Sequence, residues 1–420
     1  MVDSSGSSGS SSSIADVIAA ERTSLKDTGG VMDGSVAVGV KPSTPRSPAD
    51  VRPERVRSAD PEVFGVPTGR EEEWRFTPLD RVRPLLDGAP SDGHLTVSSE
   101  MPDGVELLEL PAGELANLGV VSPLPVDRLA AMALARAGSA LVVRVPKALE
   151  LDEPVVLRLT GPGTGEVVWG HVVLDIAEQA SATVVIEHTG SAHYAACVSV
   201  LVGDGAQLQL VQVQDWADDT LHAAHVAHRL GRDARLRSTQ VSLGGSLVRI
   251  VETVDFTAPG GDVELRGVSF ADGGQHLEHR LLVDHSAPHC RSRVTYKSAL
   301  RGEEAHTVWI GDVLIRAAAE GTDTYELNRN LLLTPEARAD SVPNLEIETG
   351  EIAGAGHASA TGRFDDEQLF YLQARGIPAD VARRMVVRGF FAEVVEGIGV
   401  PALQDRLMST IEGELARAFA

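Results

Sequence analysis

One histidine stands where its side chain could reach a metal ion. His357 lies in the segment LEIETGEIAGAGHASATGRFDDEQLFYLQARGI, residues 345–377, with two small residues on each side. Small neighbours leave an imidazole clear of bulky groups, and imidazole is a suitable ligand for borderline metals, iron among them. A histidine at such a place is also common as a purely structural residue, so composition alone leaves both interpretations open.

The other clustered histidines are weaker candidates for a metal site. They are His222, His225 and His228 in HAAHVAH, and His276, His279, His285 and His289, the last followed by Cys290. In a strand, residues three apart or directly adjacent point to opposite faces, so these side chains do not converge on one ion.

The cysteine count and the apolar runs indicate the compartment. Cys197 and Cys290 are too few for a disulfide framework or for a cysteine-only metal site within one chain. No apolar run reaches the length of a membrane span, and the first residues lack the basic-then-apolar order of a signal peptide. We therefore expect a cytoplasmic protein without membrane contact.

The net charge excludes one class of partner. The chain carries 60 acidic and 37 basic side chains, a formal charge of −23. Such a surface repels a phosphate backbone and an anionic membrane alike, so nucleic acid is not an expected partner.

Catalytic signatures are missing from the sequence. It contains no phosphate-binding loop ending in GK[ST], no G-x-G-x-x-G between strand and helix, and no H-E-x-x-H or G-x-S-x-G motif. The glycine-containing stretches at 163–166 and 244–247 are better interpreted as turns between strands, because a phosphate cradle needs a following helix N-terminus. We expect a chain that is not an enzyme and has no ATP site of its own.

The elements that must position His357 come from a long β region between two smaller parts. Residues 1–60 are rich in serine, glycine, proline and charge, which predicts a flexible tail and linker, with order beginning near Pro67. Residues 61–139 predict a mixed, partly helical region. From 140 to 356, short runs of valine, leucine and isoleucine alternate with polar residues and predict a succession of strands.

A weak repeat aligns four strand starts in this region, at Ala182, Ala206, Ala234 and Val263. The intervals are 24, 28 and 29 residues, and three of the starts follow a turn that contains glycine or aspartate. This period is typical of one coil of a β-solenoid, whose coils bury their inward faces against one another. A β-sandwich with a turn every ~8 to 12 residues is the alternative that periodicity leaves open.

Residues 357–420 predict a helical domain. Asp365 or Asp366 can cap a first helix that stops at Gly376, and Pro378 suits the first position of a second helix. The second helix is expected to bury one apolar stripe, and the third, after Pro401, another at four-residue spacing. The stripes are Val381, Ala382, Met385, Val386, Gly389 and Phe390, and Leu403, Leu407, Ile411 and Leu415.

The segment around His357 resembles the C-terminal signature of the SufB/SufD family of iron–sulfur cluster assembly proteins, in which a strand, a histidine-bearing junction and a helix reading LFYL-x-x-RGI follow one another. Residues 328–348 and the motif E-x-W-R-F-T at 72–77 also resemble elements of that family. The resemblance covers the chain from about residue 67 to its end. The matching residues in the signature are His357, Ala358, Thr361, Asp365, Leu369, Phe370, Tyr371, Leu372, Arg375, Gly376 and Ile377.

This resemblance implies a mainly β fold, with a right-handed parallel β-helix core between a small N-terminal mixed region and a C-terminal helical domain. It also implies a non-catalytic scaffold that pairs with a SufB-like subunit and binds a SufC-like ABC ATPase through its C-terminal helices. A transient iron–sulfur cluster is expected at the interface of the two β-helices. SufB-type chains carry a cysteine where this chain has Ala355, which favours the SufD branch. His357 is then the candidate ligand of this chain, with thiolates and carboxylates coming from the partner.

Two other functions remain open. A homodimeric scaffold that acts without SufB is consistent with a shared dimerising β-helix. A β-helix carbohydrate-active enzyme would also use a solenoid, but it requires carboxylates and basic residues clustered on one face and is expected to be secreted.

Overall fold

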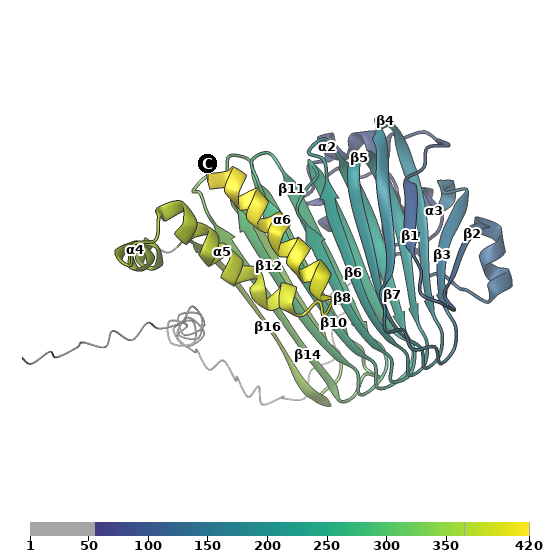
Figure 1. Ribbon diagram of the computed structural model, residues 1–420. Coiled ribbons are helices and arrows are strands. Elements are labelled where there is room, and N and C mark those ends of the chain that lie inside the picture. The colour runs from purple at the N-terminus through teal and green to yellow at the C-terminus, as the bar shows by residue number, and fades with distance from the viewer. Residues whose placement is uncertain (1–54, 365, 420) are drawn as a thin grey trace, which may run out of the picture. The chain divides into compact units, whose positions relative to one another are not determined.

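The computed structural model describes residues 55–364 and 366–419 (Figure 1). The helical elements are η2 (Pro61–Phe64), η3 (Glu72–Trp74), α2 (Leu79–Leu86), η4 (Ala112–Leu118), α3 (Arg128–Arg136), α4 (Asp366–Ala374), α5 (Ala379–Glu396) and α6 (Pro401–Phe419). The first eight strands are β1 (Thr96–Glu100), β2 (Glu106–Pro111), β3 (Ser139–Val145), β4 (Val155–Ile176), β5 (Ser181–Val202), β6 (Gln207–Trp216), β7 (Leu221–Leu230) and β8 (Arg235–Ser242). The remaining strands are β9 (Leu247–Phe256), β10 (Asp262–Ala271), β11 (His276–His285), β12 (Arg291–Leu300), β13 (His306–Ile315), β14 (Thr322–Leu332), β15 (Arg338–Ile347) and β16 (Ile352–Arg363).

The strands from β3 to β16 form a parallel β-solenoid of about eight turns. After the long strands β4 and β5, each coil has two strands. The even-numbered strands β6 to β16 stack in one row and the odd-numbered strands β7 to β15 in the other. All these neighbours pair in parallel, so the β-sandwich alternative is wrong, and the predicted solenoid is confirmed.

The register corrects the alignment of strand starts made from sequence. Ala206 and Ala234 do stack, since Gln207 pairs with Arg235. Ala182, however, pairs with Leu208 and not with Ala206. The predicted alignment is therefore two residues out at that step, and again at the last step, where Val263 pairs with Leu236 and not with Ala234. A shift of two keeps each side chain on the same face, and this is why the interior pattern could be recognised despite the error.

One corner of the solenoid is a column of turns in which each coil places a residue in the left-handed backbone region. Gly205 has φ 67° and Gly260 has φ 83°, but Asp233 and His289 occupy the same conformation in neighbouring coils with φ 51° and 58°. The amide of each column residue donates to a carbonyl of the next turn, as from Asp233 to Pro259 at 3.0 Å. These turns confirm the predicted glycine- and aspartate-containing corners.

Helices cover the outside of both rows of strands. α5 and α6 lie across the even-numbered row, where Phe391 and Leu407 pack against Val241 and Phe270 of β8 and β10 (Figure 1). α2 and α3 cover the β4, β5, β7 and β9 side, with Met132 and Trp74 in the same apolar cluster. In the described residues, no helix is both long enough and apolar enough to cross a membrane.

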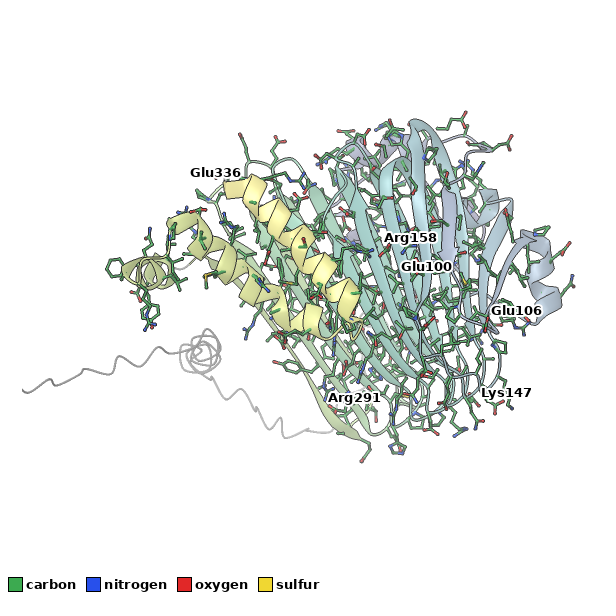
Figure 2. The ribbon with its side chains drawn as sticks, in the orientation of Figure 1. Glu100, Glu106, Lys147, Arg158, Arg291 and Glu336 are labelled. Atoms are coloured by element: carbon green, nitrogen blue, oxygen red, sulfur yellow. The ribbon has the colours of Figure 1, made fainter. Side chains whose placement is uncertain are left out.

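Contacts to the solenoid begin earlier in the chain than Pro67. Arg57 donates to Asp255 at 2.7 Å, and η2 follows with Asp60 as its cap. β1 then pairs antiparallel with β4, and Arg158 of β4 forms an ion pair with Glu100 of β1 at 2.7 Å (Figure 2). The remainder of the predicted tail, residues 1–54, lies outside the described residues.

The C-terminal part departs from the sequence expectation in three details. β16 continues to Arg363, so the last strand extends past the boundary placed between residues 356 and 357. Pro378 is the N-cap residue of α5 and not its first helical residue. The side chains of Asp365 and Asp366, one of which was expected to cap α4, are not among those that the structure describes.

The buried face of α5 matches the predicted stripe only in part, since Ala382 is buried as expected. Met385, a member of that stripe, is 39% exposed, while Val387, Phe391, Val394 and Val395 are buried. These buried residues repeat at i, i+4, i+7 and i+8, which is the spacing of one helix face. The predicted stripe of α6 is confirmed, because Leu403, Leu407, Ile411 and Leu415 are all buried.

Candidate functional site at the open end of the solenoid

β15 and β16 end the two rows of strands, and each pairs with one neighbour within the described residues. Their outer edges are therefore open. Most residues of β6 to β13 are buried, whereas β16 is largely exposed along its second half. The interior of the solenoid thus reaches the surface at this end.

His357 lies on the interior side of β16 and is exposed, because no coil of the described residues lies beyond β16. Its register partner on β14 is Glu326. Ser359, two residues on, donates to Asn328 of β14 at 3.3 Å, and Asn330 donates to Thr361 at 3.1 Å. These bonds fix which side of β16 faces the interior, and they place His357 on that side.

Glu326 is a residue that the sequence analysis missed. Its side chain points into the last complete coil and is 1% exposed, and neither carboxylate oxygen has a hydrogen-bond partner among the described residues. Burial, with Asp312 nearby, raises the pKa of Glu326 to about 8. The sequence did contain a sign of this residue's role. The face of β14 that is apolar in earlier coils is here a polar stripe, which consists of Thr322, Thr324, Glu326, Asn328 and Asn330.

The carboxylate of Glu326 occupies space that a glycine leaves free. A Cβ atom added to Gly311 of β13 would lie 2.7 Å from Glu326 Oε1 and 2.6 Å from the ring of Trp309. The indole nitrogen of Trp309 is also buried without a hydrogen-bond partner. At this end of the solenoid, the Trp309 ring therefore lies beside polar atoms of Trp309 and Glu326 that have no hydrogen-bond partner among the described residues.

Neither cysteine belongs to this end. Cys197 is fully buried, and burial raises the pKa of its thiol to about 12, so it is not a ready thiolate. Cys290 is buried at the solenoid corner, where its thiol faces the carbonyls of Ala258 and Pro288. Ala355 of β16 packs against the interior core.

The other histidine groups do not converge. His222 and His228 face the interior while His225 faces the opposite side and contacts Thr253 at 3.0 Å. His289 is a corner residue. Across the part of the chain that the structure describes, no group of three His, Cys, Asp or Glu side chains is arranged around a common point.

An exposed apolar surface lies on the first C-terminal helix. Phe370 is 72% exposed and Tyr371 51% exposed on α4, and Arg375 stacks over the Tyr371 ring at 4.6 Å. α4 packs through Leu369 and Leu372 against α5 and lies beyond the edge of the strands (Figure 1). We call Phe370 and Tyr371 the α4 patch.

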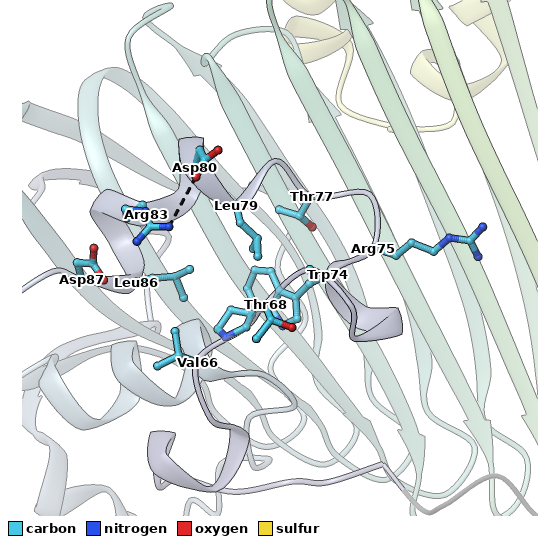
Figure 3. Close-up of a pocket in the computed structure, with 12 residues that line it drawn as sticks. Val66, Thr68, Trp74, Arg75, Thr77, Leu79, Asp80, Arg83, Leu86 and Asp87 are labelled. Carbon is cyan, nitrogen blue, oxygen red and sulfur yellow. Dashed lines mark ion pairs between the residues drawn. The ribbon is translucent and has the colours of Figure 1, made fainter.

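A pocket of about 420 Å³ lies in the N-terminal region, over the Trp74 ring (Figure 3). Asp80 and Arg83 on its wall form an ion pair at 3.6 Å. Its lining contains neither histidine nor cysteine, so it offers no soft ligand for iron.

Comparison with known proteins agrees with this geometry. Residues 158–390 match the family model described as the SUF system FeS cluster assembly, SufBD core domain. The chain is 53% identical over 371 residues to an iron–sulfur cluster assembly SufBD family protein of Mycobacterium bovis, covering 86% of this chain and 92% of that protein. The chain belongs to the SufB/SufD family.

More distant relatives of this SufB/SufD chain carry a more specific name. This chain is 25% identical to the iron–sulfur cluster assembly protein SufD of Escherichia coli, and the alignment covers 83% of this chain and 89% of that protein. It is 24% identical to the protein of the same name in Bacillus subtilis, over 79% and 82%. The predicted family is thereby confirmed.

Proposed function

We propose that this chain is the SufD-like scaffold subunit of a SUF iron–sulfur assembly complex, non-catalytic by itself, in the cytoplasm. The open end of the solenoid carries the proposal. A strand edge with unpaired backbone groups is a surface that another chain can cover, and here it carries His357.

The partner at this end is a SufB-like subunit. Its own solenoid end would cover β15 and β16, and a nascent iron–sulfur cluster, the cargo of the complex, would lie between the two chains. His357 is the ligand from this side, and thiolates come from the partner, because neither cysteine of this chain is accessible there.

The α4 patch is the proposed contact for a SufC-like ATPase. Two large exposed aromatic rings on a helix that packs only at its other face make a small apolar docking surface. The described residues offer few alternatives on the C-terminal helices, since α5 and α6 bury their apolar faces on the strands.

Co-purification tests both contacts. The full-length chain, tagged and expressed in its own host, should retain a SufB-like subunit and an ABC-type ATPase. Two variants separate the two contacts. The double substitution Phe370→Asp and Tyr371→Asp should lose the ATPase alone. Ala360→Lys, on the exposed part of β16, should lose the SufB-like subunit alone. Glu320→Gln, an exposed change on neither β16 nor α4, serves as control.

Capture of neither protein by the wild-type chain would refute the proposal. The mass of the isolated chain in solution reports on the homodimer alternative. A stable dimer that Ala360→Lys converts to monomers, with no SufB-like protein retained from the host, would establish self-pairing at the same edge instead.

A further inference from the structure

Among the described residues, three glutamates of the solenoid strands are at most 1% exposed, and two of them are fully hydrogen-bonded. Glu278 accepts hydrogen bonds from Arg280 at 2.5 Å and His276 at 3.1 Å. Glu252 accepts from Tyr296 and from Gln240. Glu326 stands apart, because both of its oxygens lack a hydrogen-bond partner among the described residues.

An unpaired carboxyl group in a protein interior is costly. Leaving such a group without a hydrogen bond destabilises the fold, and more so when the group is ionised. A hydrogen-bonded structural role does not account for this cost at Glu326, since its oxygens bond to no neighbour among the described residues. Unpaired buried groups of this kind are frequent at functional sites, where an incoming partner satisfies them.

The position of Glu326 indicates what that partner is. Glu326 and His357 are register partners on adjacent parallel strands and face the same side. Adjacent strands are ~4.8 Å apart, so a carboxylate and an imidazole that share a face can reach one ion. His357 is at the surface and Glu326 one strand deeper, so a cation entering from the open end meets the imidazole first.

We propose that Glu326 and His357 together bind one ferrous ion at the open end of the solenoid. Carboxylate with imidazole is a ligand pair that suits Fe²⁺, and two protein ligands leave coordination positions for sulfide and for the partner's thiolates. This inference deepens the proposed function, on which it rests for the identity of the metal, by adding Glu326 as a second ligand from this chain.

Anaerobic calorimetric titration of the full-length chain with Fe²⁺ alone tests the pair. Glu326→Gln and His357→Ala should each weaken binding by about tenfold or more, which is a loss of ~1.4 kcal/mol or more. The double variant should bind Fe²⁺ only slightly less tightly than the single variant with the lower affinity, because each substitution already removes the shared site. Glu320→Gln makes the same substitution at an exposed position and should bind as the wild type does.

Trp309 supplies a second signal. Its ring lies beside the Glu326 carboxylate, so Fe²⁺ bound there should quench its fluorescence. Trp309→Phe should remove the quenching and keep the calorimetric affinity. Circular dichroism melts of each variant establish that the fold is retained.

Unchanged Fe²⁺ affinity in Glu326→Gln, within about twofold of Glu320→Gln, would overturn the inference. So would a loss of affinity in Glu326→Gln that His357→Ala does not share. The titration needs neither partner, so its failure leaves the co-purification result intact. Likewise, if co-purification fails, a measured Fe²⁺ affinity still stands, but a SUF complex no longer explains it.

Discussion

Asp127 caps helix α3 with one carboxylate oxygen and accepts from Arg249 of β9 with the other. Oδ1 receives the amide of Ala130 at 2.9 Å, and Oδ2 receives Nη1 of Arg249 at 2.6 Å. Arg249 is 1% exposed and its guanidinium also lies 4.1 Å from the Trp74 ring centroid. One carboxylate therefore joins the N-terminal helical region to the solenoid wall.

Replacing this carboxylate should destabilise the chain strongly. Asp127→Ala removes the cap and leaves the Arg249 charge buried, with Glu278 as its remaining acidic neighbour, so we expect a loss of about 3–5 kcal/mol in the free energy of unfolding. Asp127→Asn keeps a capping oxygen and should lose less. Urea unfolding measures both.

Asp60 provides the matched control for the cap alone. It caps η2 at the surface through the amide of Glu62, and Asp60→Ala should cost about 1 kcal/mol or less. Equal losses for Asp60→Ala and Asp127→Ala would contradict a structural role for the Arg249 ion pair.

Acid should unfold the protein well above the pKa range of ordinary carboxylates. Burial lowers the pKa of six histidines to about 4, whereas an unfolded histidine titrates near 6.5. The unfolded chain takes up protons that the folded chain excludes. The stability present above about pH 6.5 is therefore lost as the pH falls toward 4, by up to ~1.4 kcal/mol per pH unit for each histidine.

Two carboxyl groups whose pKa is raised to near neutral pH oppose this trend without cancelling it. Burial raises the pKa of Glu252 to about 7 and of Glu326 to about 8, so both favour the folded chain increasingly as the pH falls toward 4.5. Six groups outweigh two, and the urea midpoint should drop markedly between about pH 7 and pH 5. A midpoint that stays constant over this interval would contradict the assignment of neutral buried histidines. The six are His171, His188, His225, His228, His279 and His285.

Two glycines should respond oppositely to the same substitution. Gly267 pairs with Tyr296 in the solenoid, and a Cβ there would lie 2.2 Å from the tyrosine ring. Gly267→Ala should therefore cost ~1–3 kcal/mol by overpacking. Gly413 is an exposed position of α6 with open space around it, so Gly413→Ala should gain up to about 1 kcal/mol.

Thermal melts of the two alanine variants test this contrast. The melting temperature should fall for Gly267→Ala and rise for Gly413→Ala. A tolerated Gly267→Ala would mean that the Tyr296 ring, whose hydroxyl donates to Glu252, can move aside without loss.

The sequence by itself determined the type of fold and the outline of the site. Alternating apolar residues with turns at intervals of 24 to 29 residues favoured coils that bury their faces on one another, although periodicity alone left a β-sandwich open. The small residues around His357 marked a place where an imidazole could act. Helix α6 followed from Leu403, Leu407, Ile411 and Leu415 alone, because four-residue spacing is a local property of a helix.

Tertiary structure decided what depends on neighbours distant in the chain. The register of β5 on β6, the buried face of α5 and the extension of β16 past His357 were misplaced in the sequence analysis, because each is set by packing against another element. Glu326 is the clearest case. The alternating pattern of the sequence indicated that Glu326 shares a face with Thr324 and Asn328. The stacking of β14 on β16 was needed to place its unpaired carboxyl group beside His357 at the end of the solenoid.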